Sequence, residues 1–125
     1  MINQGTINNA LTRGNKSEIQ SWTAPRVVET YQNGSNFYRI WSDGFIEQGG
    51  TQTGTISGNN YNVEASFLKA FSNKPVLSVH YDRGQGFGYN VVHAISTTGF
   101  KFFAQSAGNN YQSSSNGIVW YACGY

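Results

Sequence analysis

Residues 26–48 read RVVETYQNGSNFYRIWSDGFIEQ, and this stretch decides the fold class. Asn33-Gly34 lies between two runs of strand-forming residues. An Asn-Gly pair in that position is among the strongest short-range signals for a β-hairpin, because both residues tolerate positive φ. A Ser-Asp-Gly triplet at 42–44 is a second turn signal, and a third β-prone run follows it. The stretch therefore predicts a three-stranded antiparallel meander.

Short apolar or alternating segments, separated by turn residues, continue through the rest of the chain. In residues 76–82, for example, Leu77, Val79 and Tyr81 fall on one face of a strand. We expect about eight strands in all, over residues 26–32, 37–41, 45–48, 62–67, 76–82, 89–96, 100–105 and 117–123. Such strands, with turn signals roughly every ten residues, predict an all-β antiparallel β-sandwich.

The segments between these strands are polar or rich in glycine. Residues 49–54 are interpreted as a break between strands, and residues 83–88 and 107–116 as loops. The best helical candidate, residues 16–22, is no longer than two turns. We expect residues 1–24 to be a polar N-terminal stem or linker, and residues 25–125 to be the sandwich domain.

The last predicted strand, residues 117–123, is apolar on both of its faces. Strands of this kind are usually covered on both sides. In a sandwich of this size, one of those sides has to be covered by another chain. The strand therefore predicts an oligomer. It also carries Cys123, the only cysteine, which we interpret as a buried and inert thiol because reactive thiols need an electropositive, partly open setting.

Composition narrows the function classes. The 125 residues are enough for one domain, only 11% are charged, and the net charge is +2. This balance excludes a charged disordered chain and argues against nucleic-acid binding. No apolar stretch approaches the roughly 20 residues of a membrane span, and no signal peptide is visible. The polar residues are mostly amides and hydroxyls beside 15% aromatics, a set that bonds neutral polar ligands.

Two stretches resemble bacteriophage tail-fibre tips. Residues 25–31 and 37–50, the latter reading FYRIWSDGFIEQGG, are similar to the YRxWSDGWxEQGG segment of those tips. The ending Trp120-Tyr121-Ala122-Cys123-Gly124-Tyr125 is similar to the Trp-x-Ala-x-Gly-Tyr pattern of their last strand. The second of these stretches runs from Phe67 to the end of the sequence, and it also includes residues 71–79 and Thr98-Gly99-Phe100.

The C-terminal half also resembles the H-type lectins, through Pro75-Val76, Thr98-Gly99-Phe100 and the terminal Trp120. The sugar-binding Arg of those lectins falls near Phe87, and their Trp-His pair near Ala107-Gly108. None of these residue types is kept, so a specificity for N-acetylgalactosamine is not implied.

Taken together, the resemblances imply an H-type lectin-like, intertwined homotrimer at the tip of a tail fibre in the virion. The protein would be made in the bacterial host cytoplasm and would join the rest of the fibre. It would bind a host surface glycan, such as lipopolysaccharide or capsule, or an outer-membrane receptor, with no membrane insertion. The resemblance implies no catalysis, no cofactor and no metal.

Several side chains could instead carry chemistry. His80 and His93 could bind a metal, but ordinary surface or hydrogen-bonded roles are favoured. Asp43 and Glu47, with Glu29 and Glu64, are the obvious carboxylates for a glycosidase pair. Asp43 has a sufficient structural role in capping its own turn. Among the indoles, Trp41 and Trp120 are interpreted as core residues, with a sugar platform as the alternative; Trp22 lies in the stem.

The two loops are the favoured ligand-binding elements, because binding residues concentrate on loops that a rigid scaffold holds. They should leave the same end of the hairpin formed by residues 89–96 and 100–105. Rings, amides and one guanidinium there suit sugar hydroxyls, although two simply solvated loops would look alike. The predicted ligand-binding residues are Arg83, Phe87, Tyr89, Asn90, Asn109, Asn110 and Tyr111.

Adhesion by a fibre tip is thus the favoured function, and two alternatives stay open. The domain could serve only to trimerise and assemble a fibre, in which case another domain would recognise the host. Less favoured is a polysaccharide-degrading enzyme, for which paired carboxylates about 5–10 Å apart would be required.

Overall fold

The computed structural model describes residues 24–81, 88–106 and 117–125. These residues form an all-β antiparallel sandwich, which confirms the predicted fold class. The helical candidate at 16–22 and nearly all of the two predicted loops lie outside the described residues. The strands are β1 (Val27–Asn33), β2 (Asn36–Trp41), β3 (Ile46–Gln52), β4 (Thr55–Ser57), β5 (Asn60–Ser66), β6 (Val76–Tyr81), β7 (Gly88–His93), β8 (Gly99–Ser106) and β9 (Ile118–Gly124).

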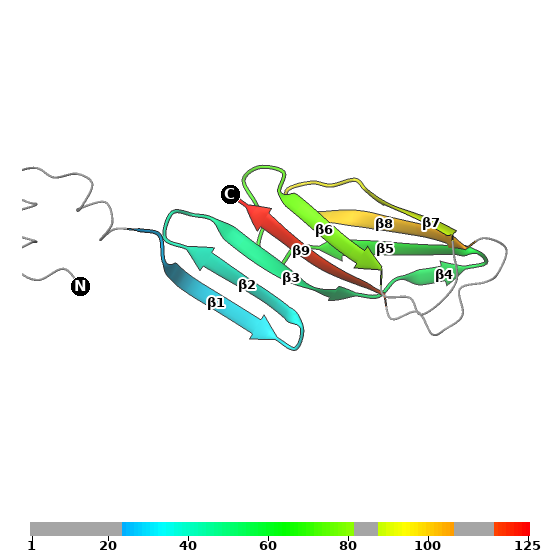
Figure 1. Cartoon of the computed structure of the whole chain (residues 1–125), viewed down its shortest axis with the longest axis horizontal. Helices are drawn as coiled ribbons and strands as arrows, with labels where there is room; N and C mark the ends of the chain where they lie inside the picture. The colour runs from blue at the N-terminus through cyan, green and yellow to red at the C-terminus, as the bar shows by residue number, and fades with distance from the viewer. Residues whose placement is uncertain (1–23, 82–87, 107–116) are drawn as a thin grey trace, which may run out of the picture.

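The strands form two sheets (Figure 1). Sheet A has five strands in the order β1-β2-β3-β9-β6, and sheet B has four in the order β4-β5-β8-β7. Every pairing within them is antiparallel. Within the described residues, no helix is long and apolar enough to cross a membrane.

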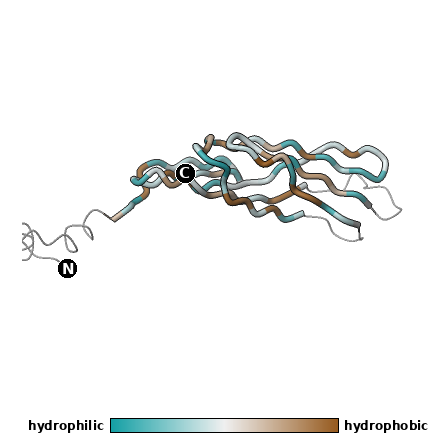
Figure 2. The backbone as a smooth tube through the Cα atoms, turned by 90° about the horizontal axis from the view of Figure 1, so that it is seen from above, coloured by the Kyte–Doolittle hydropathy of each residue, from teal (hydrophilic) through white to brown (hydrophobic). Residues whose placement is uncertain are grey.

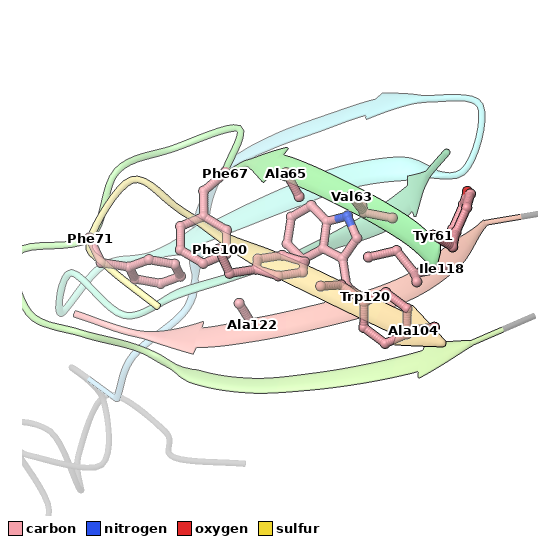
Figure 3. Packing of buried hydrophobic residues seen from close by; sticks show 11 residues of the cluster. Tyr61, Val63, Ala65, Phe67, Phe71, Phe100, Ala104, Ile118, Trp120 and Ala122 are labelled. Atoms are coloured by element: carbon pink, nitrogen blue, oxygen red, sulfur yellow. The ribbon is translucent and has the colours of Figure 1, made fainter. Parts of the chain in front are cut away.

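The core lies between the sheets and is strongly aromatic (Figure 3). Trp120 of β9 packs against Phe67 and Phe100, with ring centroids 5.6 and 5.8 Å apart. Phe67 also meets Phe71 edge to face. The alternating burial of β5 and β9 follows from the two-residue period of a strand, which sends every second side chain inward. Trp120 is therefore a core residue, as predicted.

The predicted meander is confirmed as β1, β2 and β3, with one difference at its first turn. Asn33 pairs with Asn36, so the two turn residues are Gly34 and Ser35. Of these, only Gly34 has a positive φ, of 61°, which is the pattern of a type II′ hairpin turn. At the second turn, the Phe45 N–H donates to Asp43 Oδ1 at 3.0 Å, which confirms the predicted capping role of Asp43.

The predicted break at residues 49–54 is wrong, because β3 continues through Gly49 and Gly50 to Gln52. A side chain at Gly49 would meet the Trp120 carbonyl oxygen and the Phe37 ring, and one at Gly50 would collide with the Asn36 carboxamide. The glycines are there because neighbouring groups lie directly against the strand, and not because the strand ends.

The short strand β4 was not predicted at all, so the structure has nine strands where about eight were expected. It forms a hairpin with β5 through a two-residue turn at Gly58 and Asn59, in which Gly58 has a φ of 59°. The last part of predicted strand 89–96 is also wrong, because β7 ends at His93 and Ala94 has a φ of 52°.

The molecule has two distinct ends. Val27 enters β1 beside Trp41 at one end, where Ile46 also pairs with Gly124. At the other end Tyr81 pairs with Ile118, and Gly88 with Ser106. Tyr61 of sheet B stacks on Tyr81 of sheet A there, so the two sheets finish together. Figure 2 shows the elongated body with the approach to β1 at one extremity. We call the two extremities the entry end and the far end.

Candidate functional site

β9 lies between β3 and β6 in sheet A, and in the single chain its two faces differ in burial. Ile118, Trp120 and Ala122 are buried against sheet B. Val119 and Tyr121 point the other way and are 44% and 40% exposed. Cys123 lies on this outer face of sheet A and is only partly buried, whereas the sequence predicted a buried thiol. One face of this apolar strand is therefore only partly covered by the described residues.

Glu47 organises the polar part of the same face. Its side chain, 19% exposed, accepts a hydrogen bond from the Tyr121 hydroxyl at 2.8 Å and from the Trp41 indole N–H at 3.4 Å. The Arg39 guanidinium lies 3.7 Å from the same carboxylate and also sits over the Phe37 ring. The carboxylate is thus held by donors of its own chain, which lets the face be covered without leaving a charge unpaired.

Tyr121 should make stability fall at high pH. Burial, and then its hydrogen bond to Glu47, raise the pKa of its hydroxyl from 10.0 to about 12. Between those values the unfolded chain has released this proton and the folded chain has not, so the free energy of unfolding decreases as pH rises. Denaturation curves at several pH values should show this decrease, and Tyr121→Phe should reduce its slope above pH 10. Equal slopes for the two proteins would contradict the assignment.

A second polar cluster lies on the β1–β2 ribbon. The rings of Tyr31 and Tyr38 stack 5.3 Å apart, and the Tyr38 hydroxyl donates to Glu29 at 2.6 Å. Lys69 adds an ion pair to Glu29 at 3.4 Å and lies over the Tyr38 ring. These contacts lower the pKa of Glu29 and raise that of Lys69. Every residue of β1 is exposed. Figure 1 shows the β1–β2 ribbon to one side of sheet B.

The remaining candidate residues for metal binding, stacking or catalysis are His80, His93, Trp41 and Asp43. His80 and His93 are exposed on their strands. Within the described ranges, no three residues of the metal-binding types gather into a group that could hold an ion. The predicted core role of Trp41 is wrong, because the residue is only half-buried, lies outside the core and donates its indole N–H to Glu47. Asp43 also accepts a hydrogen bond from the Tyr125 hydroxyl at 3.3 Å.

Gln48 is the residue that the sequence reasoning missed. Its side chain is fully buried in the single chain. Its amide nitrogen donates to the Lys69 carbonyl oxygen at 2.7 Å, and its amide oxygen accepts from the Lys69 N–H at 3.0 Å. The only available signal was its place in the Glu-Gln-Gly-Gly segment, which does not name a partner 21 residues away.

Most of the predicted ligand-binding residues lie outside the described residues, namely Arg83, Phe87, Asn109, Asn110 and Tyr111. Tyr89 and Asn90 are described, and both are exposed on β7. They are consecutive in a strand, so their side chains leave opposite faces of the sheet. Gly88 pairs with Ser106, so the start of β7 and the end of β8 are neighbours at the far end. The ligand site itself stays a prediction.

The fold defines a class of protein, the small antiparallel sandwiches with a five-stranded and a four-stranded sheet. Among solved structures, the chain is similar to an N-truncated R1-type pyocin tail fibre, with a TM-score of 0.53 and 18% identity. The match covers 90% of this chain and 95% of that chain. At this identity the likeness shows a shared fold. No family model and no curated protein match the sequence. The likeness to H-type lectins and the trimer stay expectations.

Proposed function

We propose that this chain is the tip of a tail fibre of a phage, or of a related phage-tail-like particle, and that it binds a glycan on the host surface. The observation that carries the proposal is the two-ended body. The chain enters β1 at one end, while the strands that flank both predicted ligand loops finish at the other. A fibre attached at the entry end would present the far end to a cell. The fold shared with a pyocin tail fibre supports this assignment.

The chemistry that we propose is adhesion without catalysis. All four candidate carboxylates for a glycosidase pair are engaged. Asp43 caps its turn and Glu47 holds three donors. Glu29 accepts from Tyr38 and pairs with Lys69, and Glu64 pairs with Lys101. A single shallow sugar site gives about −4 kcal/mol, or a millimolar Kd. Linked sites raise the apparent affinity by roughly 10²–10⁴. Repeated weak sites on a virion suit a particle that samples a surface before committing.

We also propose that the tip is a homotrimer, with the outer face of sheet A in the contact between protomers. Val119 and Tyr121 are exposed there in the single chain, as is Val76 on the neighbouring β6. Arg39 and Glu47 neutralise each other on the same face, so identical copies approach without charge repulsion.

Light scattering of the protein in dilute solution tests this assembly. The expected mass is three times 13.8 kDa. A monomer at micromolar concentration would overturn the trimer.

A glycan array probed with the intact assembly tests the adhesive function. We expect binding to bacterial envelope polysaccharides, with no release of oligosaccharides. A stable trimer that binds none of them would favour the alternative, a domain that only assembles the fibre. Release of oligosaccharides would instead favour the enzyme.

A further inference from the structure

The outer face of sheet B is an ordered array of amide, hydroxyl and aromatic side chains. The sheet register places Tyr89 opposite Gln105, and Gln105 opposite Asn60. The next outward row consists of Val91, Phe103, Asn62 and Thr55, each paired with its neighbour. Strands lie about 4.8 Å apart, so four of them span roughly 14 Å. This length can hold more than one sugar ring.

An aromatic platform occupies the β7 side of this array. The Tyr89 ring is tilted against Phe103 with centroids 6.0 Å apart, and Tyr89 is 57% exposed. Val91 is exposed next to both of them. The two rings lie side by side on the outer face, and more than half of Tyr89 stays open to solvent. A ring exposed in this way can pack on the C–H face of a pyranose while its hydroxyl stays hydrated.

Amides stand beside the platform in a fixed geometry. The Gln105 amide nitrogen donates to Asn60 Oδ1 at 3.1 Å, so each side chain orients the other. An amide group has two N–H donors and an acceptor oxygen with two lone pairs. The bond between Gln105 and Asn60 therefore leaves both groups able to donate and accept further bonds. Paired donors and acceptors are what neighbouring sugar hydroxyls require.

The β4 side of the array ends in a shallow hollow of about 440 Å³, lined by Thr53, Gly54, Thr55, Asn62 and Glu64. It continues the row that contains Phe103. Charge on the face is balanced, because Lys101 and Glu64 form an ion pair at 3.3 Å. Among the described residues of this face there is no Lys or Arg besides Lys101, so an anionic polymer would find no unpaired Lys or Arg there.

We infer that the outer face of sheet B binds a chain of neutral sugar residues, which stacks on Tyr89 and runs across the strands toward the hollow beside β4. This inference rests on the proposed adhesive function and names a surface outside the two predicted loops. The array lies at the far end, because Tyr89 and Gln105 are next to the pair formed by Gly88 and Ser106. A glycan held there would meet the surface that the fibre presents to a cell.

Titration with purified polysaccharides tests the inference. The probes are neutral O-polysaccharides and neutral capsular polysaccharides, with polysialic acid as the anionic comparison. At least one neutral probe should bind the intact protein and shift the NMR signals of the Asn60 and Gln105 side-chain amides. Tyr89→Ala should weaken that binding at least tenfold, as loss of an aromatic anchor does, and Tyr89→Phe should retain most of it. Polysialic acid should bind more weakly than the neutral probe.

Tyr31→Ala is the matched control, because Tyr31 is also an exposed tyrosine stacked on a second ring, but on sheet A. It should leave polysaccharide binding unchanged. If a neutral probe binds and Tyr89→Ala binds it equally well while remaining folded, the inference is wrong and the adhesive function stands. If only anionic probes bind, the inference is again wrong. If no polysaccharide binds at all, both the inference and the adhesive function fail.

Discussion

Replacement of Gln48 by methionine should lower the free energy of unfolding by about 2–4 kcal/mol. Methionine has a similar length but no amide, so the Lys69 N–H and carbonyl oxygen would both lose their partner. Each polar group left without a hydrogen bond in a buried place costs about 1–3 kcal/mol. Urea denaturation at one fixed protein concentration measures the change, since an assembly makes stability depend on concentration.

Gln52→Met is the matched control for this experiment. Gln52 lies on the same strand and is exposed, and its side-chain amide donates to the neighbouring Thr53 carbonyl oxygen at 3.1 Å. Its replacement should change the free energy of unfolding by no more than about 0.5 kcal/mol. Equal effects of the two substitutions would show that the attachment of residue 69 to β3 is not what stabilises the sandwich.

Val119→Glu should convert the proposed trimer into a folded monomer. In the proposed assembly Val119 lies within the contact between protomers, and each buried carboxylate without a partner costs several kcal/mol. A three-fold assembly would bury three of them, side by side and of like charge. In the single chain the same residue is 44% exposed, so the protomer itself should fold.

Val91→Glu is an unusually close control, because Val91 is also a valine with 44% exposure on a strand, but on the outer face of sheet B. It should remain trimeric by light scattering. A Val119→Glu protein that keeps the mass of the trimer would place the contact on another surface. Loss of the folded state in Val119→Glu, seen by circular dichroism, would show that the face stabilises the protomer itself.

The parts of the fold that the sequence predicts are those fixed by local chemistry. Turn residues at 34 and 42–44 locate the meander, and the alternation in β6 assigns its inner face, because both signals act within a few residues. The double glycine was misread because its cause is not local. Phe37 and the Asn36 side chain come from another strand, so only the paired structure shows why residues 49 and 50 lack side chains. The three-residue β4 is too short to show a period.

The candidate sites also divide into contacts within one turn, which the sequence predicts, and contacts between distant strands, which it does not. The capping role of Asp43 is a contact within its own turn and could be predicted. The contact between Glu47 and Tyr121 joins residues 74 positions apart, and the contact between Tyr89 and Phe103 depends on the register of β7 with β8. Neither follows from composition or spacing, because register is set by the packing of whole strands. A glycan site on the face of a sheet is therefore harder to predict from sequence than a site on a loop.

The separation of the entry end from the far end has a mechanical consequence. In the proposed function, a virion that drifts while its fibre is attached would pull on β1 at one end and on the ligand at the other. That tension runs along the strands, and antiparallel hydrogen bonds lie perpendicular to the strands. The bonds between β1 and β2 would then share the load in shear instead of opening one after another. β1 is an edge strand whose one strand neighbour is β2, so in the proposed fibre this ribbon would set much of the force that the attached tip withstands.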